Sequence, residues 1–327
     1  MAASDNPGVM HPLDVDDQPA EDSGLDDVVH EESSTASLTS SILNYREENG
    51  RRYHAYDVEK YQLPNDELEQ ERLDITHHLW LLVQDNRLFR CPLKRPIRVL
   101  DVGTGTGIWA IDVADEHPQA EVIGIDISPI QPSWVPPNLT FQVDDLEKTW
   151  EFGGNYDLVF IRSMIGSFKS WPSIFGQAFL SLGSGGFVEV QDHQYPLVCD
   201  DDTIENTNIL QWTKHLIEAA KRAERSITVA KDFEKLLEEA GFVDVKVIKG
   251  QVPMNAWPKS KQLKERGFFC RHILDVGIEG ISMRYFTEKL SWSVEEATVF
   301  LASVRKDVSN LDIHGYWWTY TVYGRKP

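Results

Sequence analysis

The pattern of apolar and polar positions predicts a strand, a tight turn and a helix in one stretch. Residues 99–102 form a short apolar run that stops at glycines, as a buried strand does before a turn. Residues 107–117 repeat apolar side chains at helical spacing, and Pro118 ends this helix. A second strand over residues 121–126 ends in Asp126. This order is the first βαβ unit of a nucleotide-binding α/β sheet.

The glycine spacing distinguishes two kinds of nucleotide ligand. A dinucleotide-binding turn has the spacing Gly-x-Gly-x-x-Gly, and after Gly103 and Gly105 the third glycine would fall at position 108, which is Ile108. The chain instead has Asp101 followed by glycines at 103, 105 and 107. This pattern resembles motif I of the class I S-adenosylmethionine (SAM) methyltransferases. The alternative is a glycine turn in an unrelated α/β protein.

The chemistry of SAM suits this turn. SAM carries an ammonium and a sulfonium, which the acid Asp101 complements, and glycines let the backbone approach the methionine and ribose portions. Asp126 would accept hydrogen bonds from both ribose hydroxyls. The cofactor-binding residues expected in this stretch are Asp101, Gly103, Thr104, Gly105, Gly107, Asp126 and Ile127.

Further apolar runs extend the sheet. Strands are predicted at residues 139–145, 156–162, 186–193 and 242–248, and helices at 170–182, 204–223, 228–240 and 293–307. In the resembled fold, the last strand, here residues 314–323, inserts antiparallel beside the fifth. The predicted fold class is therefore α/β: a Rossmann-like, seven-stranded class I methyltransferase sheet with helices on both faces.

Two strand ends carry further candidate cofactor contacts. The third strand ends in Asp144 and Asp145, where this fold recognises the adenine amino group, with the Leu146 backbone nearby. For either acid alone, a solvated turn is the alternative. The fourth strand ends in Arg162 and Ser163, which face the cofactor because ligands bind at the carboxyl ends of parallel strands.

The predicted fifth strand ends in a reactive cluster of Glu189, Gln191, Asp192 and His193. Imidazole titrates near neutral pH, so His193 is the candidate catalytic base. The alternative is a polar histidine at the rim of the site. The fourth strand is followed by Ser-Met-Ile rather than an Asn-Pro-Pro-Tyr type sequence, which disfavours methylation of nucleobase or glutamine nitrogens.

The region before the first sheet strand has a different character. Residues 44–56 are rich in aromatic and polar side chains without core periodicity, which predicts a segment that wraps onto the core. Residues 63–82 predict a helix opened by Pro64 and Asn65. Its expected apolar stripe consists of Leu68, Leu73, Ile75, Leu79 and Leu82.

Several stretches resemble the fungal LaeA-like methyltransferases. These include Glu48-Asn-Gly-Arg-x-Tyr-His-x-Tyr, Tyr61-x-Leu-Pro-Asn-Asp-Glu, Glu71-Arg-Leu-Asp-x-x-His-His, Ser128-Pro-Ile-Gln-Pro-Ser-Trp and Tyr323-Gly-Arg-Lys-Pro. The resemblance covers about residues 42–327. It implies that the segment before the first strand folds over SAM, with Tyr45, Arg51, Tyr53 and His54 as candidate contacts. Packing of these side chains on the core is the alternative.

Charge and composition limit the partners and the compartment. The net charge is −20, and residues 1–40 contain ten acidic residues and no Lys or Arg, which predicts a disordered acidic tail and no direct nucleic-acid partner. Three cysteines without a CxxC pair indicate a reducing compartment. The chain has no apolar signal region and no membrane-spanning run, so a cytoplasmic or nuclear protein is expected.

The expected organisation is a tail at residues 1–40, a cofactor-covering segment at 41–95 and a methyltransferase domain at 96–327. An insert at about 255–292 carries aromatic residues and is the expected roof of the substrate pocket, with core packing as the alternative for each of them: Trp257, Phe268, Phe269, Tyr285 and Phe286. No metal site is expected, since the adjacent His77 and His78 point to different faces of their helix.

Two functions follow from the resemblance. The first is an enzyme that methylates an oxygen of a small molecule in fungal secondary metabolism. The second is a LaeA-like nuclear regulator of gene clusters that binds SAM and acts with velvet-type partner proteins. An enclosed, aromatic-lined pocket above the cofactor would favour the enzyme, and an open site with a large apolar patch would favour the regulator.

Overall fold

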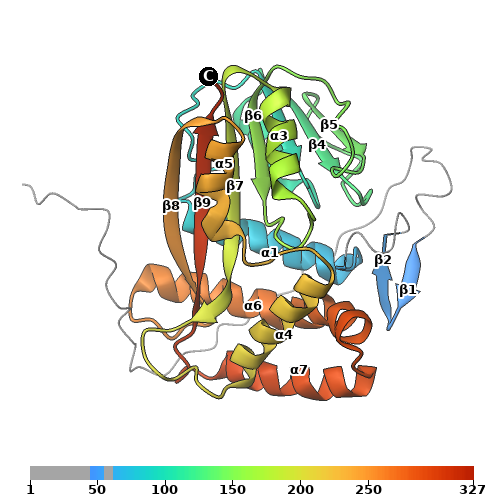
Figure 1. Ribbon diagram of the computed structural model, residues 1–327, viewed down its shortest axis with the longest axis vertical. Helices are drawn as coiled ribbons and strands as arrows, with labels where there is room; N and C mark the ends of the chain where they lie inside the picture. Colours follow the sequence, from blue (N-terminus) through green and yellow to red (C-terminus); the bar gives the residue numbers. More distant parts are fainter. Residues whose placement is uncertain (1–44, 55–61) are drawn as a thin grey trace, which may run out of the picture.

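A seven-stranded sheet forms the centre of the computed structural model, which describes residues 45–54 and 62–327. The strand order is β5-β4-β3-β6-β7-β9-β8 (Figure 1). Neighbouring strands from β5 to β7 are parallel, whereas β9 is antiparallel to both β7 and β8, so the predicted sheet is confirmed. The strands are β3 (Arg98–Val102), β4 (Glu121–Asp126), β5 (Leu139–Val143), β6 (Tyr156–Arg162), β7 (Leu182–Val198), β8 (Val243–Pro253) and β9 (Tyr316–Arg325).

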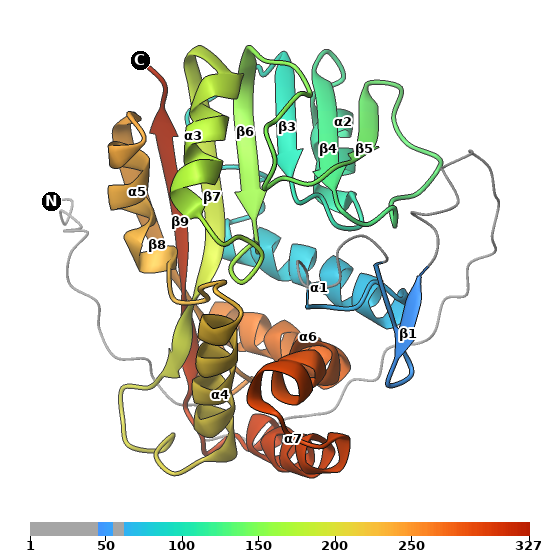
Figure 2. The ribbon, with the colours of Figure 1, turned by 45° about the vertical axis from the view of Figure 1, so that its right-hand side comes forward.

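Helices cover both faces of this sheet, as buried parallel strands require. On one face lies α2 (Ile108–Glu116), whose Trp109 stacks on Phe160 of β6 with ring centroids 3.7 Å apart. The other face is covered by α3 (Trp171–Ser181), the short 3-10 helix η1 (Ala230–Asp232) and α5 (Phe233–Glu239) (Figure 2). Trp171 and Phe233 pack together between these helices.

A helical layer lies beyond the carboxyl ends of the parallel strands (Figures 1 and 2). It consists of α4 (Asn208–Arg222), α6 (Lys261–Arg284), the π-helical turn η2 (Tyr285–Lys289) and α7 (Val294–Ser309). Its core includes Trp212, Ile278, Phe286 and Leu301, each fully buried. The long strands β7, β8 and β9 extend out of the sheet into this layer and connect the two parts of the fold.

Helix α1 (Glu67–Val83) lies between the sheet and α6, and a small hairpin of β1 (Arg46–Glu48) and β2 (Arg51–Tyr53) adjoins its first turn. The predicted helix over residues 63–82 is thus confirmed, although it begins at Glu67, because the Asp66 side chain caps it by accepting from the Glu69 backbone N–H.

The predicted apolar stripe of α1 is wrong in part. Leu68 is 51% exposed, whereas Glu69, Arg72, Thr76 and His77 are buried beside Leu79 and Trp80. Glu69 and Arg72 form a buried ion pair, with Arg72 Nη2 2.6 Å from Glu69 Oε1. Polar residues can line a buried helix face when each finds a partner, and hydrophobic periodicity alone does not reveal such pairs.

Other boundaries differ from the prediction for local reasons. The helix predicted from residue 204 begins at Asn208, since Thr207 caps it by accepting from the Leu210 backbone N–H. Strands β7 and β8 run on to Val198 and Pro253 because both continue to pair with β9 as far as Tyr316. The predicted tail at residues 1–40 lies outside the described residues.

We expect Glu189 to be a structural residue. Its buried carboxylate accepts hydrogen bonds from the backbone N–H groups of Arg90 and Cys91 and from the Gln191 side chain. Glu189→Ala leaves two backbone donors unpaired, so the free energy of unfolding should fall by about 3 kcal/mol in urea denaturation. Glu189→Gln retains one acceptor oxygen, so its free energy of unfolding should fall by less. An equal decrease in the two variants would contradict this structural role.

Candidate functional site

Two cavities adjoin at the carboxyl ends of the parallel strands. The first, here called the turn cavity, has a volume of about 100 Å³ and lies at the ends of β3, β4, β5 and β6. The second, here called the helix cavity, has a volume of about 170 Å³ and lies between α1, β7, α4 and α6. Most of the expected cofactor residues line the turn cavity: Gly103, Gly105, Asp126, Ile127, Asp144, Asp145, Leu146 and Arg162.

The glycine turn after β3 needs its glycines. Gly103 has a φ of +78°, and a Cβ atom there would lie 2.3 Å from Met164 Sδ. A Cβ atom at Gly107, whose φ is +83°, would lie 2.3 Å from Phe141 Cζ. Side chains at these positions would clash with their neighbours and strain the backbone.

Asp101 and Thr104 support the turn from behind. The Thr104 hydroxyl donates to Asp101 Oδ2 over 2.6 Å, and burial raises the pKa of Asp101 to about 7. Neither residue lines the turn cavity, and Gly107 does not line it either. The geometry therefore gives these three predicted residues a role in shaping the turn.

Asp126 at the end of β4 has both carboxylate oxygens engaged by backbone groups. Oδ2 accepts from the Gly105 N–H over 2.8 Å, and Oδ1 accepts from the Ser128 N–H over 2.9 Å. Burial raises the pKa of Asp126 to about 6, so the group is ionised at pH 7. Each carboxylate oxygen can accept a further hydrogen bond.

Buried polar atoms beside the turn cavity lack partners within the described part of the chain. They are the Ser128 hydroxyl and the Asn65 side-chain Nδ2, and both residues line the cavity. Ser128 and Asn65 are 3% and 1% exposed, so water does not readily satisfy these groups. Unpaired buried polar atoms are costly, which indicates that a polar ligand completes the cavity.

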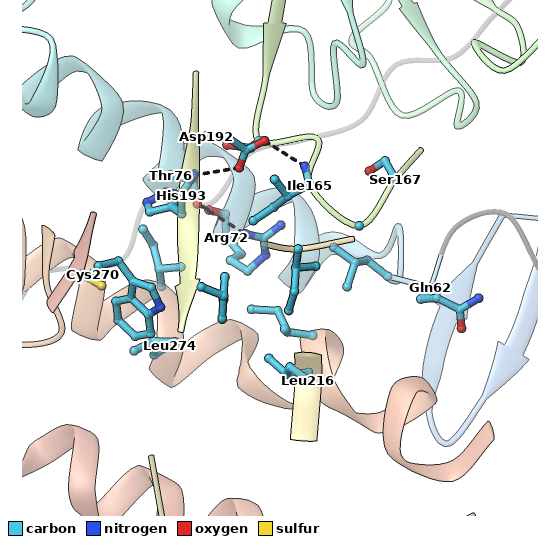
Figure 3. A pocket seen from close by; sticks show the side chains of 18 of the residues that line it. Gln62, Arg72, Thr76, Ile165, Ser167, Asp192, His193, Leu216, Cys270 and Leu274 are labelled. Carbon is cyan, nitrogen blue, oxygen red and sulfur yellow. Dashed lines mark hydrogen bonds between the residues drawn. The ribbon is translucent and has the colours of Figure 1, made fainter. Parts of the chain in front are cut away.

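The helix cavity is mostly apolar. Its walls include Leu79 of α1, Leu216 of α4, and Cys270, Ile273 and Leu274 of α6. Asp192 and His193 of β7 and Arg72 of α1 provide polar groups at one side (Figure 3). Trp317 also lines this cavity, and its indole N–H has no hydrogen-bond partner among the described residues.

Asp192 and His193 differ in their suitability as bases. Asp192 accepts from the backbone N–H groups of Met164 and Ile165, and burial raises its pKa to about 7. Burial, together with the positive charge of Arg72, lowers the pKa of His193 to about 4. His193 is therefore neutral at pH 7 and a weak base, whereas the pKa of Asp192 is matched to neutral pH.

The segment after β6 is the shared wall of the two cavities, and Ser163 and Ser167 line both of them. Met164 lines the turn cavity, and Ile165 lines the helix cavity. Ser163 has a φ of +57°, an unfavourable value for serine, and its hydroxyl accepts from Trp80 Nε1 over 2.9 Å. Strained backbone of this kind concentrates at functional sites.

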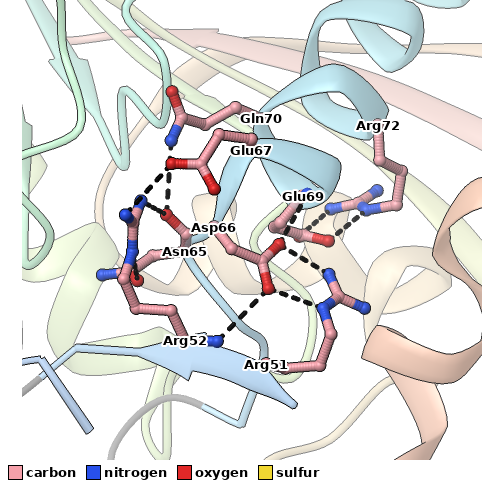
Figure 4. Close-up of polar contacts among 8 residues, drawn as sticks. All are labelled: Arg51, Arg52, Asn65, Asp66, Glu67, Glu69, Gln70 and Arg72. Atoms are coloured by element: carbon pink, nitrogen blue, oxygen red, sulfur yellow. Dashed lines mark hydrogen bonds and ion pairs between the residues drawn. The ribbon is translucent and has the colours of Figure 1, made fainter. Parts of the chain in front are cut away.

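Ion pairs hold the start of α1 in place (Figure 4). Arg51 donates to both oxygens of Asp66, and Arg72 donates to both oxygens of Glu69. On α6, a Cβ atom at Gly277 would lie 2.2 Å from Arg72 Cδ. The glycine thus makes the space in which Arg72 reaches the helix cavity.

Some predicted residues lie away from the cavities. Tyr53 lines neither cavity. Its ring packs against the Arg284 guanidinium, whose Cζ lies 4.9 Å from the ring centroid. Glu189 and Gln191 bond to each other and line neither cavity. Of the aromatic residues named for the insert, Tyr285 lines the helix cavity, whereas Trp257 and Phe286 are buried in the core. The wall that α6 contributes is mainly aliphatic.

Several residues that shape the site were not predicted from the sequence. They are Met164, Trp80, Asn65, Ser128 and Trp317, together with the α6 residues that line the helix cavity, Cys270, Ile273 and Leu274. Met164 directly follows the predicted Arg162-Ser163 pair, so its place after a strand end was an available signal. Ser128 follows the predicted strand end at Asp126 by two residues, so the same signal applied to it. Trp80, Trp317 and the α6 residues come together through packing between elements far apart in the sequence.

Two negative findings apply to the described part of the chain. No group of three or more His, Cys, Asp or Glu side chains is arranged to hold a metal ion. Across residues 45–54 and 62–327, none of the helices combines the length and apolarity needed to cross a bilayer.

Comparison with known proteins identifies the family. A sequence model described as "Methyltransferase domain" matches residues 75–247. Methyltransferase pytC of Aspergillus terreus is 40% identical over 299 residues, which cover 90% of this chain and 92% of pytC. The secondary metabolism regulator laeA of Aspergillus flavus is 35% identical over 299 residues, covering 90% and 81%. The protein-methionine methyltransferase laeA of Emericella nidulans is 33% identical over 295 residues, covering 89% and 79%.

The resemblance noted from the N-terminal stretches is thereby confirmed. With its glycine turn, its sheet order and these relatives, the chain belongs to the fungal LaeA-like family of SAM-dependent methyltransferases.

Proposed function

We propose that the protein transfers the methyl group of SAM to a hydroxyl oxygen of a small, largely apolar molecule. The turn cavity holds the cofactor, and the helix cavity holds the acceptor. The observation that carries this proposal is the wall that both cavities share at Ser163 and Ser167. A transfer reaction needs donor and acceptor bound side by side at a common boundary.

The residues of the turn cavity fit SAM. Gly103 and Gly105 let the backbone approach the methionine and ribose portions, and the free lone pairs of Asp126 accept from the ribose hydroxyls. Asp144, Asp145 and the Leu146 backbone lie at the adenine end. The unpaired Ser128 hydroxyl and Asn65 amide supply further hydrogen-bonding groups for the cofactor.

The helix cavity fits an apolar acceptor with few polar groups. Its aliphatic walls supply the apolar surface, and the unpaired indole N–H of Trp317 is a donor for an oxygen of the acceptor. Asp192 takes the hydroxyl proton, and neutral His193 orients the hydroxyl. SAM supplies an activated methyl group: the acceptor oxygen bonds to the methyl carbon as the carbon–sulfur bond breaks.

The second candidate is a regulator with velvet-type partners. The name of the laeA relative, "Secondary metabolism regulator", favours a regulatory role and does not mention a partner. The apolar lining of the helix cavity favours an apolar small-molecule acceptor. The two candidates predict different destinations for the methyl group, so an assay distinguishes them.

SAM labelled on the methyl group, incubated with the purified protein and a fungal metabolite extract, tests the proposal. We expect label in the organic phase, and the labelled compound can then be identified. Label confined to precipitated protein, or no transfer despite measured SAM binding, would contradict the proposal and favour the protein-directed alternative.

Asp126 should dominate cofactor affinity. Asp126→Ala removes the carboxylate that accepts from the ribose and also releases the Gly105 and Ser128 N–H groups. We expect the Kd for SAM to rise by about a hundredfold in calorimetric titration, the equivalent of two charge-assisted hydrogen bonds. Asp115→Ala, an exposed acid on α2, is the matched control. Unchanged binding in Asp126→Ala would show that the cofactor lies elsewhere.

Asp192 should determine how activity falls on the acidic side of the pH–rate profile. Its carboxylate form takes the proton, so kcat/KM for the acceptor should fall as pH decreases through about 7, the pKa that burial gives this group in the ligand-free protein. Asp192→Asn should lower kcat by about a hundredfold, flatten the acidic side of the profile and leave the KM for SAM unchanged. A variant that keeps the wild-type pH profile would exclude Asp192 as the base.

A further inference from the structure

A chain of three polar side chains runs from α2 through α1 to the end of β6. Arg162 Nη2 donates to His77 Nδ1 over 2.8 Å, and His77 Nε2 lies 2.9 Å from Asp112 Oδ2. Arginine has no acceptor, so His77 Nδ1 must be unprotonated, and Nε2 carries the proton that goes to Asp112. These contacts fix both the tautomer and the ring orientation of His77.

Among these three hydrogen-bonded side chains, Arg162 is a cation that forms no ion pair with another described residue. Burial lowers the pKa of Arg162 to about 10, which still leaves it protonated at pH 7. Burial also lowers the pKa of His77, so its ring is neutral and does not balance the guanidinium charge. Asp101 attracts Arg162 from behind the glycine turn, and Asp112 does so from beyond His77.

The strand order places Arg162 at one end of the turn cavity. Along the sheet edge the strands run β5, β4, β3, β6, so Asp144, Asp126, Gly103 and Arg162 follow one another in that sequence. The first two lie at the adenine and ribose ends proposed above, which leaves Gly103 and Arg162 at the methionine end. The α-carboxylate is the anionic group of SAM and lies at this end.

We propose that His77 is a positioning residue: with Asp112, it holds the Arg162 guanidinium in place to bind the α-carboxylate of the cofactor. The guanidinium has further N–H donors besides the one given to His77, and arginine pairs well with carboxylates. His77 itself does not line the turn cavity. Helix α1 thus contributes to cofactor affinity through a residue that does not touch the cofactor.

A comparison of two ligands isolates this contact. SAM carries the α-carboxylate, whereas 5′-methylthioadenosine has the same adenosine and a neutral thioether in place of the sulfonium, without the amino-acid portion. The difference at sulfur is the same for every variant, so the change in the ratio from wild type is the quantity compared. The ratio of the two Kd values, measured by calorimetry on the full chain, reports recognition of the amino-acid end. The ratio is internal to each variant, so a lower folded fraction affects both ligands equally and cancels.

We expect His77→Ala to weaken SAM about tenfold and to leave 5′-methylthioadenosine unchanged. His77→Gln offers an amide oxygen to Arg162 and an amide N–H to Asp112, so it should restore much of the loss. Arg162→Met should reduce SAM binding at least as much as His77→Ala. His78→Ala, an exposed neighbour on α1 that packs against Phe269, is the matched control.

Two results would overturn the proposal. Equal weakening of both ligands in His77→Ala would make His77 a general structural residue of α1. An unchanged ratio in Arg162→Met would show that the carboxylate binds elsewhere. Neither result bears on the identity of the methyl acceptor, so this test is independent of the transfer assay.

Discussion

The hydrogen bond from Trp80 Nε1 to Ser163 Oγ joins α1 to the point where the two cavities meet. Ser163 holds a left-handed backbone conformation there, and its own N–H donates to the Gln191 carbonyl. The bond holds the segment that separates the proposed donor and acceptor sites. A displaced Ser163 would change both cavities together, because it lines both.

Helix α1 makes this possible because two of its faces are used. Leu73, His77 and Trp80 face the sheet, where they meet the glycine turn, Arg162 and Ser163. Glu69 and Arg72 belong to the face toward α6, where the missing side chain of Gly277 admits Arg72. Breaking a buried ion pair by removing one partner typically costs several kcal/mol, so this packing resists change. The helix therefore connects the sheet to the helical layer through specific polar contacts.

The strand, turn, helix and strand around Asp101 and Asp126 were predictable from sequence because local apolar runs, glycine spacing and terminal acids all agree. That Asp144, Asp145 and Arg162 lie together at one cavity was also predictable, since the carboxyl ends of parallel strands meet at one edge of the sheet. The burial of the polar face of α1 was not predictable. Its Glu69–Arg72 ion pair is local, three residues apart on the same helix, but α6 covers that pair only in the tertiary fold. The aliphatic wall of the helix cavity likewise depends on how α6 packs against α1 and β7.

A crystal structure with S-adenosylhomocysteine bound tests most directly the claim that the two cavities form one transfer site. We expect the product cofactor in the turn cavity, with its ribose on Asp126, its carboxylate on Arg162, and its sulfur facing the helix cavity beside Ser163. A sulfur atom directed away from the helix cavity, with the shared wall closed between them, would show that the two cavities do not form one transfer site.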